Sequence, residues 1–360
     1  MFASMTSASS RTTSVSPSFT ARERNATGRQ EHPPAAPFFL TLPPVEKWRS
    51  AAFVARARRG IGWRLAKARE RTDWATRRAT TRLRLRPTFL VIGAQKSGTT
   101  SLHGYLSEHP CVLCATVKEV QYFHRYYEQG ESWYRAQFPL AIRGAAIRRR
   151  LGVGPAVGEA SAAYLFDPRT PERVHEFNPD MKLVAVLRDP VERAYSHYQM
   201  EYRWERETLP FEEALRREET ELEPELERVL ADPWGYSDLV FRISYVARGR
   251  YAEQLERWLG FFPREQLLVL TSEELLAHPA EAMAEIVRFL GLPEFRAESY
   301  PLRGVREYPP MDPRTRERLA RVFEPHNRQL GELLGRELGW TRPAGVKVTE
   351  RGGLGIRPAS

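Results

Sequence analysis

Three short apolar runs, each next to a helical pattern, dominate the chain after Pro87. Residues 88–92, 182–187 and 266–270 have the length and apolar content of buried strands. Near these runs, apolar residues recur every three or four positions, as in an amphipathic helix. Strands that alternate with helices predict an α/β domain, with a central parallel sheet flanked by helices on both faces. The helical stripes are Leu102, Tyr105 and Leu106; Val191, Ala194, Tyr195, Tyr198 and Tyr202; Leu255, Trp258, Leu259 and Phe262; and Met283, Ile286, Val287 and Leu290.

The rest of the chain divides by composition. Residues 211–230 carry Glu and Arg every three or four positions, which predicts an exposed helix with ion pairs on its surface. Residues 1–45 and 341–360 contain few large apolar groups and are interpreted as flexible tails. Residues 46–86 combine basic side chains with aromatic ones, which is typical of a basic helical arm. Residues 87–340 then form the main domain.

The 360-residue chain has a formal net charge of +10, of which residues 1–88 carry +13 and residues 89–360 carry −3. The arm therefore suits a membrane surface or a nucleic acid, or it packs its tryptophans on the domain. For the domain itself we expect no nucleic-acid partner. No run approaches the ~20 apolar residues of a membrane-spanning helix, and two cysteines make no disulfide framework. We expect a soluble cytoplasmic protein, with the arm as its only route to a membrane surface.

The turn after the first predicted strand has the composition of an anion cradle. Its glycines let successive N–H groups point inward, and the helix that follows adds the positive end of its dipole. The spacing is not that of a nucleoside-triphosphate loop, because Gly98 is followed by Thr99 instead of by Lys and Ser or Thr. This mismatch makes a kinase that uses nucleoside triphosphates only the second enzyme hypothesis. The sequence also lacks a clear strand-ending Asp for Mg²⁺, which argues against a kinase. The turn reads Gly93-Ala94-Gln95-Lys96-Ser97-Gly98-Thr99-Thr100-Ser101.

A second anion site is indicated where the second predicted strand ends. Arg188 closes the strand, Asp189 can cap the next helix, Pro190 suits its first turn, and Ser196 lies two turns further on. An arginine binds phosphate through two parallel N–H bonds, and a hydroxyl adds a third contact. The structural alternative is that Arg188 pairs with Asp189 while Ser196 faces solvent.

Both segments resemble motifs of one enzyme family. Residues 95–101 resemble the 5′-phosphosulfate loop of sulfotransferases that use 3′-phosphoadenosine 5′-phosphosulfate (PAPS), and residues 188–196 resemble their 3′-phosphate motif. Over about residues 88–340 the chain is most similar to the heparan sulfate N-sulfotransferase group; residues 118–123, 133–134, 249–259 and 306–312 carry the further matches. The resemblance implies a P-loop-type α/β fold and a PAPS site made by Gln95, Lys96, Ser97, Gly98, Thr99, Thr100, Ser101, Arg188, Ser196, Arg306 and Tyr308.

Sulfuryl transfer needs a cation beside the leaving phosphate and a base beside the hydroxyl or amine that accepts the group. Lys96 meets the first need, and the resemblance implies Glu119 as the base. Lys118 beside it is able to lower its basicity instead. We therefore expect a PAPS-dependent sulfotransferase that requires no metal. Its acceptor is expected to be a carbohydrate or another small molecule.

Two features depart from a simple match. Around Arg306 and Tyr308 two lysines of the family's pattern are missing, and Arg303 is a candidate replacement for one of them. Cys111 and Cys114 have metal-ligand spacing but supply only half of a four-ligand zinc site. We expect these two small side chains to pack in the interior.

Overall fold

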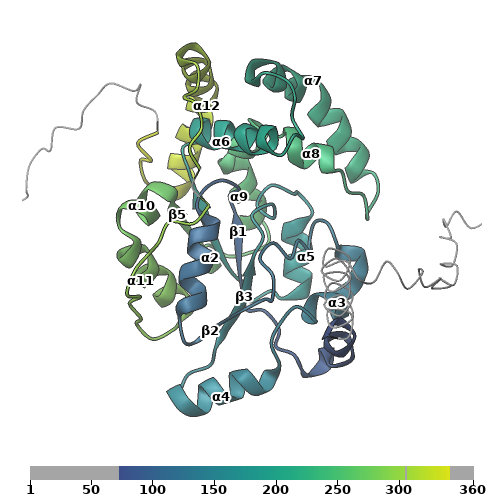
Figure 1. Ribbon diagram of the computed structural model, residues 1–360, viewed down its shortest axis with the longest axis vertical. Coiled ribbons are helices and arrows are strands. Elements are labelled where there is room, and N and C mark those ends of the chain that lie inside the picture. The colour runs from purple at the N-terminus through teal and green to yellow at the C-terminus, as the bar shows by residue number, and fades with distance from the viewer. Residues whose placement is uncertain (1–72, 305, 341–360) are drawn as a thin grey trace, which may run out of the picture. The chain divides into compact units, whose positions relative to one another are not determined.

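The computed structural model describes residues 73–304 and 306–340. At its centre is a five-stranded sheet with the strand order β2-β3-β1-β4-β5, and every neighbouring pair is parallel. The three predicted strands are β1, β4 and β5, so the predicted α/β architecture is confirmed (Figure 1). The strands are β1 Phe89–Gly93, β2 Val112–Cys114, β3 Ala156–Ala160, β4 Lys182–Leu187 and β5 Leu267–Thr271.

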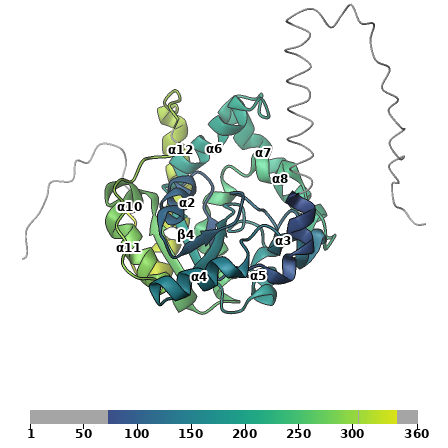
Figure 2. The ribbon, with the colours of Figure 1, turned by 60° about the horizontal axis from the view of Figure 1, so that its bottom comes forward.

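Helices cover both faces of this sheet. In Figures 1 and 2, α10 and α11 lie on one side of the strands, while α3 and α5 lie on the other. Short 3₁₀ turns occur at Thr81–Leu83, Tyr127–Gln129, Ala247–Gly249 and Arg264–Gln266. The helices are α2 Thr99–Glu108, α3 Gly130–Arg135, α4 Ala141–Leu151, α5 Thr170–Phe177, α6 Pro190–Arg203, α7 Phe211–Leu230, α8 Asp238–Ile243, α9 Tyr251–Leu259, α10 Ser272–Ala277, α11 Pro279–Leu290 and α12 Pro313–Leu334.

The apolar strands are buried on both faces because successive side chains of a strand point in opposite directions. Leu90 and Ile92 of β1 join the core that includes α9, whereas Phe89 and Val91 join the core that includes α2 and α11. Each such aliphatic or aromatic side chain contributes roughly 1.5–3 kcal/mol when it is fully buried. The sheet is thereby held rigidly between two apolar layers, and its loops start from fixed positions.

The two strands that the apolar pattern did not predict are β2 and β3. β2 has only three residues, and β3 contains Gly158 and Glu159, which are both unusual in a buried strand. A β-carbon on Gly158 would lie 2.4 Å from the carbonyl oxygen of Phe89, so only glycine lets β3 approach β1 this closely. This pairing sets Glu159 beside Leu90 of β1.

The acidic helix predicted at residues 211–230 is α7, with the same bounds. The prediction that this helix is exposed is wrong for one of its faces. Phe211, Ala214 and Leu215 are buried against residues of α6 and α12. Glu218 is 5% exposed and accepts the backbone N–H groups of Val246 and Ala247 at 2.7–2.8 Å. The helix is therefore amphipathic, with one carboxylate inside the protein.

Part of the predicted basic arm falls within the described residues. Residues 73–79 are helical, and the Trp74 ring contacts Trp133 of α3 edge to face, with 6.0 Å between ring centroids. This contact agrees with an arm that packs its tryptophans on the domain. The rest of the arm and both predicted tails lie outside the described residues, and the boundary at residue 87 stays a prediction. Within residues 73–304 and 306–340, no helix is long and apolar enough to cross a membrane.

Replacing Glu218 by Gln should change how stability depends on pH. Burial raises the pKa of Glu218 to about 7, although hydrogen bonds from the backbone oppose the shift. The folded protein thus holds this proton more tightly than the unfolded chain does, and the resulting stability is lost as pH rises through about 7. The free energy of unfolding of the wild type, minus that of Glu218→Gln, should fall by roughly 2–3 kcal/mol between about pH 5 and pH 8. Urea denaturation at each pH measures this difference in free energy. A difference that does not change with pH would contradict the raised pKa of Glu218.

Candidate active site

The turn between β1 and α2 forms a backbone cradle at the carboxyl edge of the sheet. Gly98 has a φ of +92° and Lys96 a φ of +71°, both in the left-handed region. α2 begins at Thr99 without a side-chain cap, as α4, α7 and α9 also do, whereas Asp189 caps α6 and Asp312 caps α12. The N–H groups of a helix's first turn have no acceptor inside the helix. The uncapped start of α2 is therefore suited to binding an anion.

Lys96 is the cation of this cradle. Burial, assisted by the nearby charges of Arg203 and Arg188 and opposed by Glu201, lowers its pKa to about 8. The Nη1 group of Arg188 donates to the backbone oxygen of Lys96 at 3.3 Å, and Nη2 lies 3.7 Å from Glu192. Cations held this close to one another repel, and a bound anion relieves that repulsion. The residues present therefore fit a phosphate or sulfate group.

The structural alternative for Arg188 and Ser196 does not match the observed contacts. The Asp189 carboxylate accepts the N–H groups of Val191 and Glu192, so it caps α6 instead of pairing with Arg188. Ser196 is 6% exposed and does not face solvent. Arg188 instead contacts the cradle through the Lys96 oxygen and lies near Glu192, and its contact with a 3′-phosphate stays a prediction.

Gln95 is oriented by a buried arginine that the sequence did not single out. Its Oε1 accepts from Nη1 of Arg248 at 3.2 Å. The Arg248 guanidinium lies 5.0 Å from the ring centroids of both Phe166 and Phe241. Burial, assisted by the charge of Arg193, lowers the pKa of Arg248 to about 9. Because the Gln95 carbonyl faces Arg248, its NH₂ group is directed elsewhere and can donate to an anion.

The strap, which we define as residues 300–304 and 306–312, connects α2 with α6. Ser101 Oγ accepts the N–H of Arg303 at 2.9 Å, and the Tyr105 hydroxyl donates to the backbone oxygens of residues 300 and 301. At the other end, the Tyr195 hydroxyl donates to the oxygen of residue 309 at 3.0 Å, and its ring lies 5.5 Å from that of Tyr308. Of the predicted site residues, Ser101 thus holds the strap beside the cradle, and Tyr308 belongs to the strap.

The side chains of the strap's two arginines make no hydrogen bond or ion pair with the cradle among the described residues. The guanidinium of Arg303 forms an ion pair with Glu108 at 3.3 Å, at the last residue of α2. In this structure the ion pair places the Arg303 charge at the other end of that helix, and the replacement of a missing lysine by Arg303 stays a prediction. Arg306 is exposed. Its predicted role in cofactor binding stays a prediction.

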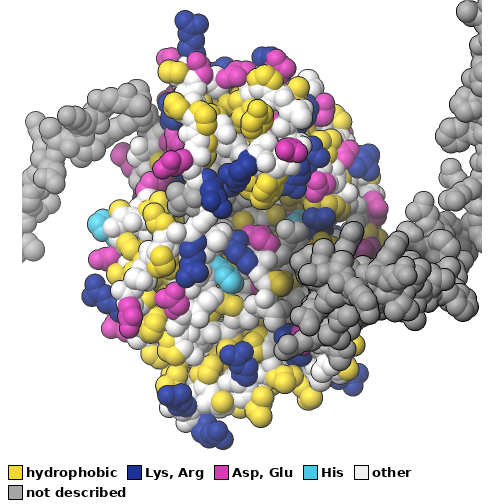
Figure 3. Space-filling view, viewed as in Figure 1, with side chains coloured by type: hydrophobic (Ala, Val, Ile, Leu, Met, Phe, Trp, Pro, Cys, Tyr) yellow, Lys and Arg dark blue, Asp and Glu magenta, His cyan; other side chains and the backbone are white. Residues whose placement is uncertain are grey.

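A second group of side chains surrounds Glu119, whose backbone is also left-handed at a φ of +60°. Its Oε1 lies 2.5 Å from Nζ of Lys118, and its Oε2 accepts the N–H of Ala162 at 3.0 Å. His103 of α2 is close enough for both charges to affect its pKa, which burial lowers; its buried Nε2 has no hydrogen-bond partner among the described residues. Figure 3 shows basic, acidic and histidine side chains gathered around a recess on this face. The Glu119 side chain is about one-third exposed, so an acceptor can reach it.

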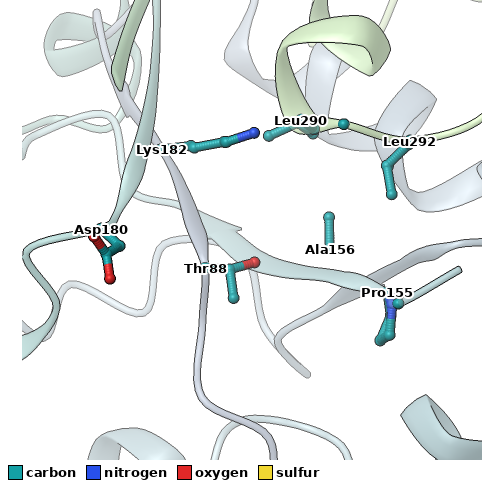
Figure 4. A pocket seen from close by; sticks show the side chains of 9 residues that line it. Thr88, Pro155, Ala156, Asp180, Lys182, Leu290 and Leu292 are labelled. Atoms are coloured by element: carbon teal, nitrogen blue, oxygen red, sulfur yellow. The ribbon is translucent and has the colours of Figure 1, made fainter. Parts of the chain in front are cut away.

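A pocket at the opposite, amino-terminal edge of the sheet carries no comparable chemistry (Figure 4). Thr88, Ala156, Asp180 and Lys182 are among the residues that line it. The Lys182 ammonium already donates to the oxygen of Phe289 at 2.7 Å. Ligands of open parallel sheets bind at the carboxyl edge, so we assign no function to this pocket.

The cysteine pair behaves as a structural feature. Cys111 and Cys114 are free thiols; the first is buried and the second half-buried. Across residues 73–304 and 306–340, no group of three or more His, Cys, Asp or Glu is arranged to hold a metal ion.

Comparison with known proteins identifies the family. Residues 86–300, more than half of the chain, match the model of the sulfotransferase domain. The chain belongs to the sulfotransferase domain family. A sulfotransferase from Alicyclobacillus acidocaldarius is 35% identical, with a TM-score of 0.53; the match covers 72% of this chain and 100% of that one. The P-loop-type fold implied by the sequence is thus confirmed.

Two curated relatives indicate the range of this sulfotransferase family. Human bifunctional heparan sulfate N-deacetylase/N-sulfotransferase 3 is 31% identical over 309 residues, covering 78% of this chain and 33% of that protein. The membrane-associated sulfotransferase kil1 of Dictyostelium discoideum is 28% identical over 319 residues, covering 71% and 66%. The chain therefore spans about a third of the length of the N-deacetylase/N-sulfotransferase.

Binding of a phosphate-bearing ligand should be linked to protonation of Lys96. The pKa of this ammonium is lowered to about 8, so part of the population is neutral near pH 8.5, and a bound anion restores the charge. At about pH 8.5, the protein should take up protons when it binds adenosine 3′,5′-bisphosphate. Calorimetry in buffers of different ionisation enthalpy measures this uptake. Lys96→Met should lose this uptake and bind about 10- to 100-fold more weakly. Equal uptake by both proteins would remove Lys96 from the ligand site.

Proposed function

We propose that this sulfotransferase moves a sulfuryl group from PAPS to a hydroxyl or amine of a carbohydrate-containing acceptor. The observation that supports it most is the uncapped start of α2 beside Lys96, with Arg188 at the same edge of the sheet. One anion there would relieve the repulsion that Lys96 experiences, and a second would bind Arg188, which Asp189 leaves unpaired because it caps α6. PAPS carries both charges, at its 5′ and 3′ positions.

On the leaving side, the protein stabilises developing negative charge. When bound, PAPS supplies the sulfuryl group and the 5′-phosphate from which it departs. The Lys96 ammonium, the first-turn N–H groups of α2 and the Gln95 amide would surround that phosphate and the sulfuryl oxygens. Arg188 and Ser196 would hold the 3′-phosphate, and the strap with Arg306 and Tyr308 would cover the nucleotide.

On the accepting side, Glu119 would take the proton that the hydroxyl or amine loses. The backbone N–H of Ala162 fixes one carboxylate oxygen, and the Lys118 ammonium fixes the other. β3 neighbours β1, so the turn at Glu119, which bonds to Ala160 at the end of β3, lies at the same edge as the cradle. A base and a leaving-group cation at one edge are what direct transfer between two bound molecules requires.

The two alternative functions, a kinase and a nucleic-acid-binding protein, account for fewer of these observations. Transfer from a nucleoside triphosphate needs a carboxylate for Mg²⁺, and Asp189, which follows β4, is committed to capping α6. Nucleic-acid binding rests on basic residues of which most lie outside the described part of the chain. A carbohydrate acceptor is favoured because a relative's name assigns it heparan sulfate.

Arg188→Ala should separate the two phosphate sites. We expect about 10- to 100-fold weaker binding of adenosine 3′,5′-bisphosphate, the typical loss of a hydrogen bond to a charged group. Binding of adenosine 5′-monophosphate, which lacks the 3′-phosphate, should stay at its wild-type value. Calorimetric titration measures both, with Arg148→Ala on α4 as an exposed control. An equal loss of affinity for the two ligands would show that Arg188 does not contact the 3′-phosphate.

Glu119→Gln should slow transfer without weakening the nucleotide. An amide of the same shape cannot take the acceptor's proton, and loss of a general base costs about 10²- to 10⁴-fold in rate. Sulfuryl transfer from radiolabelled PAPS measures the rate, while affinity for adenosine 3′,5′-bisphosphate reports whether the site is intact. Wild-type turnover in this variant would place the base elsewhere.

A further inference from the structure

A fully buried carboxylate lies beneath the turn that carries Glu119. Glu159 of β3 is 1% exposed. Its Oε2 accepts the hydroxyl of Ser161 at 2.8 Å, and its Oε1 accepts the hydroxyl of Tyr164 at 2.6 Å. The Tyr134 hydroxyl is more distant, at 3.5 Å. Both close donors direct their only hydroxyl proton at the carboxylate.

The same two hydroxyls also hold the backbone of the turn. Ser161 Oγ accepts the N–H of Gln121 at 2.9 Å, and the Tyr164 oxygen accepts the N–H of Tyr122 at 2.9 Å. Each hydroxyl therefore relays a hydrogen bond from the turn to the carboxylate. Glu159 is the common end of both relays.

This turn needs such support because of its backbone conformation. Glu119 and Gln121 have φ angles of +60° and +59°, which side chains with a β-carbon rarely adopt. Two further bonds attach the turn to the end of β3: Glu119 N–H donates to the oxygen of Ala160 at 2.9 Å, and Ala162 N–H donates to the Glu119 carboxylate. Residues 160–164 thus hold the backbone of this turn and one oxygen of the Glu119 carboxylate.

We propose that Glu159 is a positioning residue for the transfer reaction: its ionised carboxylate holds, through Ser161 and Tyr164, the turn that aims Glu119 at the acceptor. The proposal rests on the role proposed above for Glu119. It assigns no contact between Glu159 and either substrate.

The charge state of Glu159 gives the proposal a measurable signature. Burial raises its pKa to about 7, the nearby Glu119 adds to the shift, and the hydrogen bonds from Tyr164 and Ser161 oppose it. The other titratable groups that face it are the phenol of Tyr134 and the thiol of Cys114 on β2. When the carboxyl takes up a proton as pH falls through about 7, it must donate instead of accept at one oxygen, and one relay is broken.

The decisive variant is Glu159→Gln, studied in the full chain. Its amide keeps the shape but can accept only one of the two hydroxyl protons. We expect kcat for sulfuryl transfer to fall about 10- to 100-fold, as for a displaced catalytic group, while KM for PAPS stays at the wild-type value. The wild-type decline of kcat as pH falls through about 7 should be absent in the variant. Ser161→Ala and Tyr164→Phe each remove one relay and should each give a partial loss of kcat.

Glu218→Gln is the matched control. Glu218 is equally a buried carboxylate whose pKa is raised to about 7, and it also ends a set of backbone hydrogen bonds, but it lies on α7. This variant should keep both the wild-type kcat and its decline near pH 7. If Glu159→Gln retains wild-type kcat and pH profile, or if Glu218→Gln loses the profile to the same extent, the proposal is overturned.

Affinity for adenosine 3′,5′-bisphosphate shows whether each variant is folded. Should Glu159→Gln fail to bind it, Ser161→Ala and Tyr164→Phe decide: loss of kcat with intact affinity supports the relay, and unchanged kcat in both overturns it. Glu119→Gln separates this inference from the proposed function. An inactive Glu119→Gln together with a fully active Glu159→Gln contradicts the positioning role alone, whereas an active Glu119→Gln contradicts the proposed base.

Discussion

Positive charge concentrated at the carboxyl edge of the sheet is the constraint on which the rest of the site depends. Lys96, Arg188 and Arg203 lie close enough for the two arginines to lower the pKa of the lysine, and the start of α2 adds its dipole without a side-chain cap. Such an arrangement costs free energy until an anion binds. Asp189 caps α6 instead of pairing with Arg188, so that within the described part of the chain only Glu192, at 3.7 Å, forms an ion pair with this arginine.

The acceptor side depends on a different part of the fold. Its turn is held by the end of β3, and β3 reaches β1 only because Gly158 has no side chain. The spacing between the nucleotide cradle and Glu119 is therefore set by two paired strands instead of by loops. A site built on rigid elements keeps its reacting groups aligned without ordering them at each turnover.

Elements formed by one continuous segment were predicted from the sequence, whereas features that depend on the pairing of distant segments were not. The apolar runs of β1, β4 and β5 and the loop at Lys96 are continuous segments, so their patterns were visible. β3 was not, because five residues with Gly158 and Glu159 carry no strand signal. The relays that start from its carboxylate end on a turn about 40 residues earlier, and Arg248 contacts Gln95, 153 residues before it. The ion pair of Arg303 with Glu108 was likewise not predicted, because the two residues are 195 positions apart in the chain.

Amide hydrogen exchange on the full chain, with and without adenosine 3′,5′-bisphosphate, tests the anion cradle most directly. Bound ligand should slow exchange within residues 95–101, because N–H groups of this segment would then donate to its 5′-phosphate; Ser97, whose N–H already donates to Ala94, should change least. Mg²⁺-ATP at the same concentration should protect these amides less, since it lacks the 3′-phosphate that Arg188 is proposed to hold. Saturating adenosine 3′,5′-bisphosphate that leaves exchange in this segment unchanged would contradict the account.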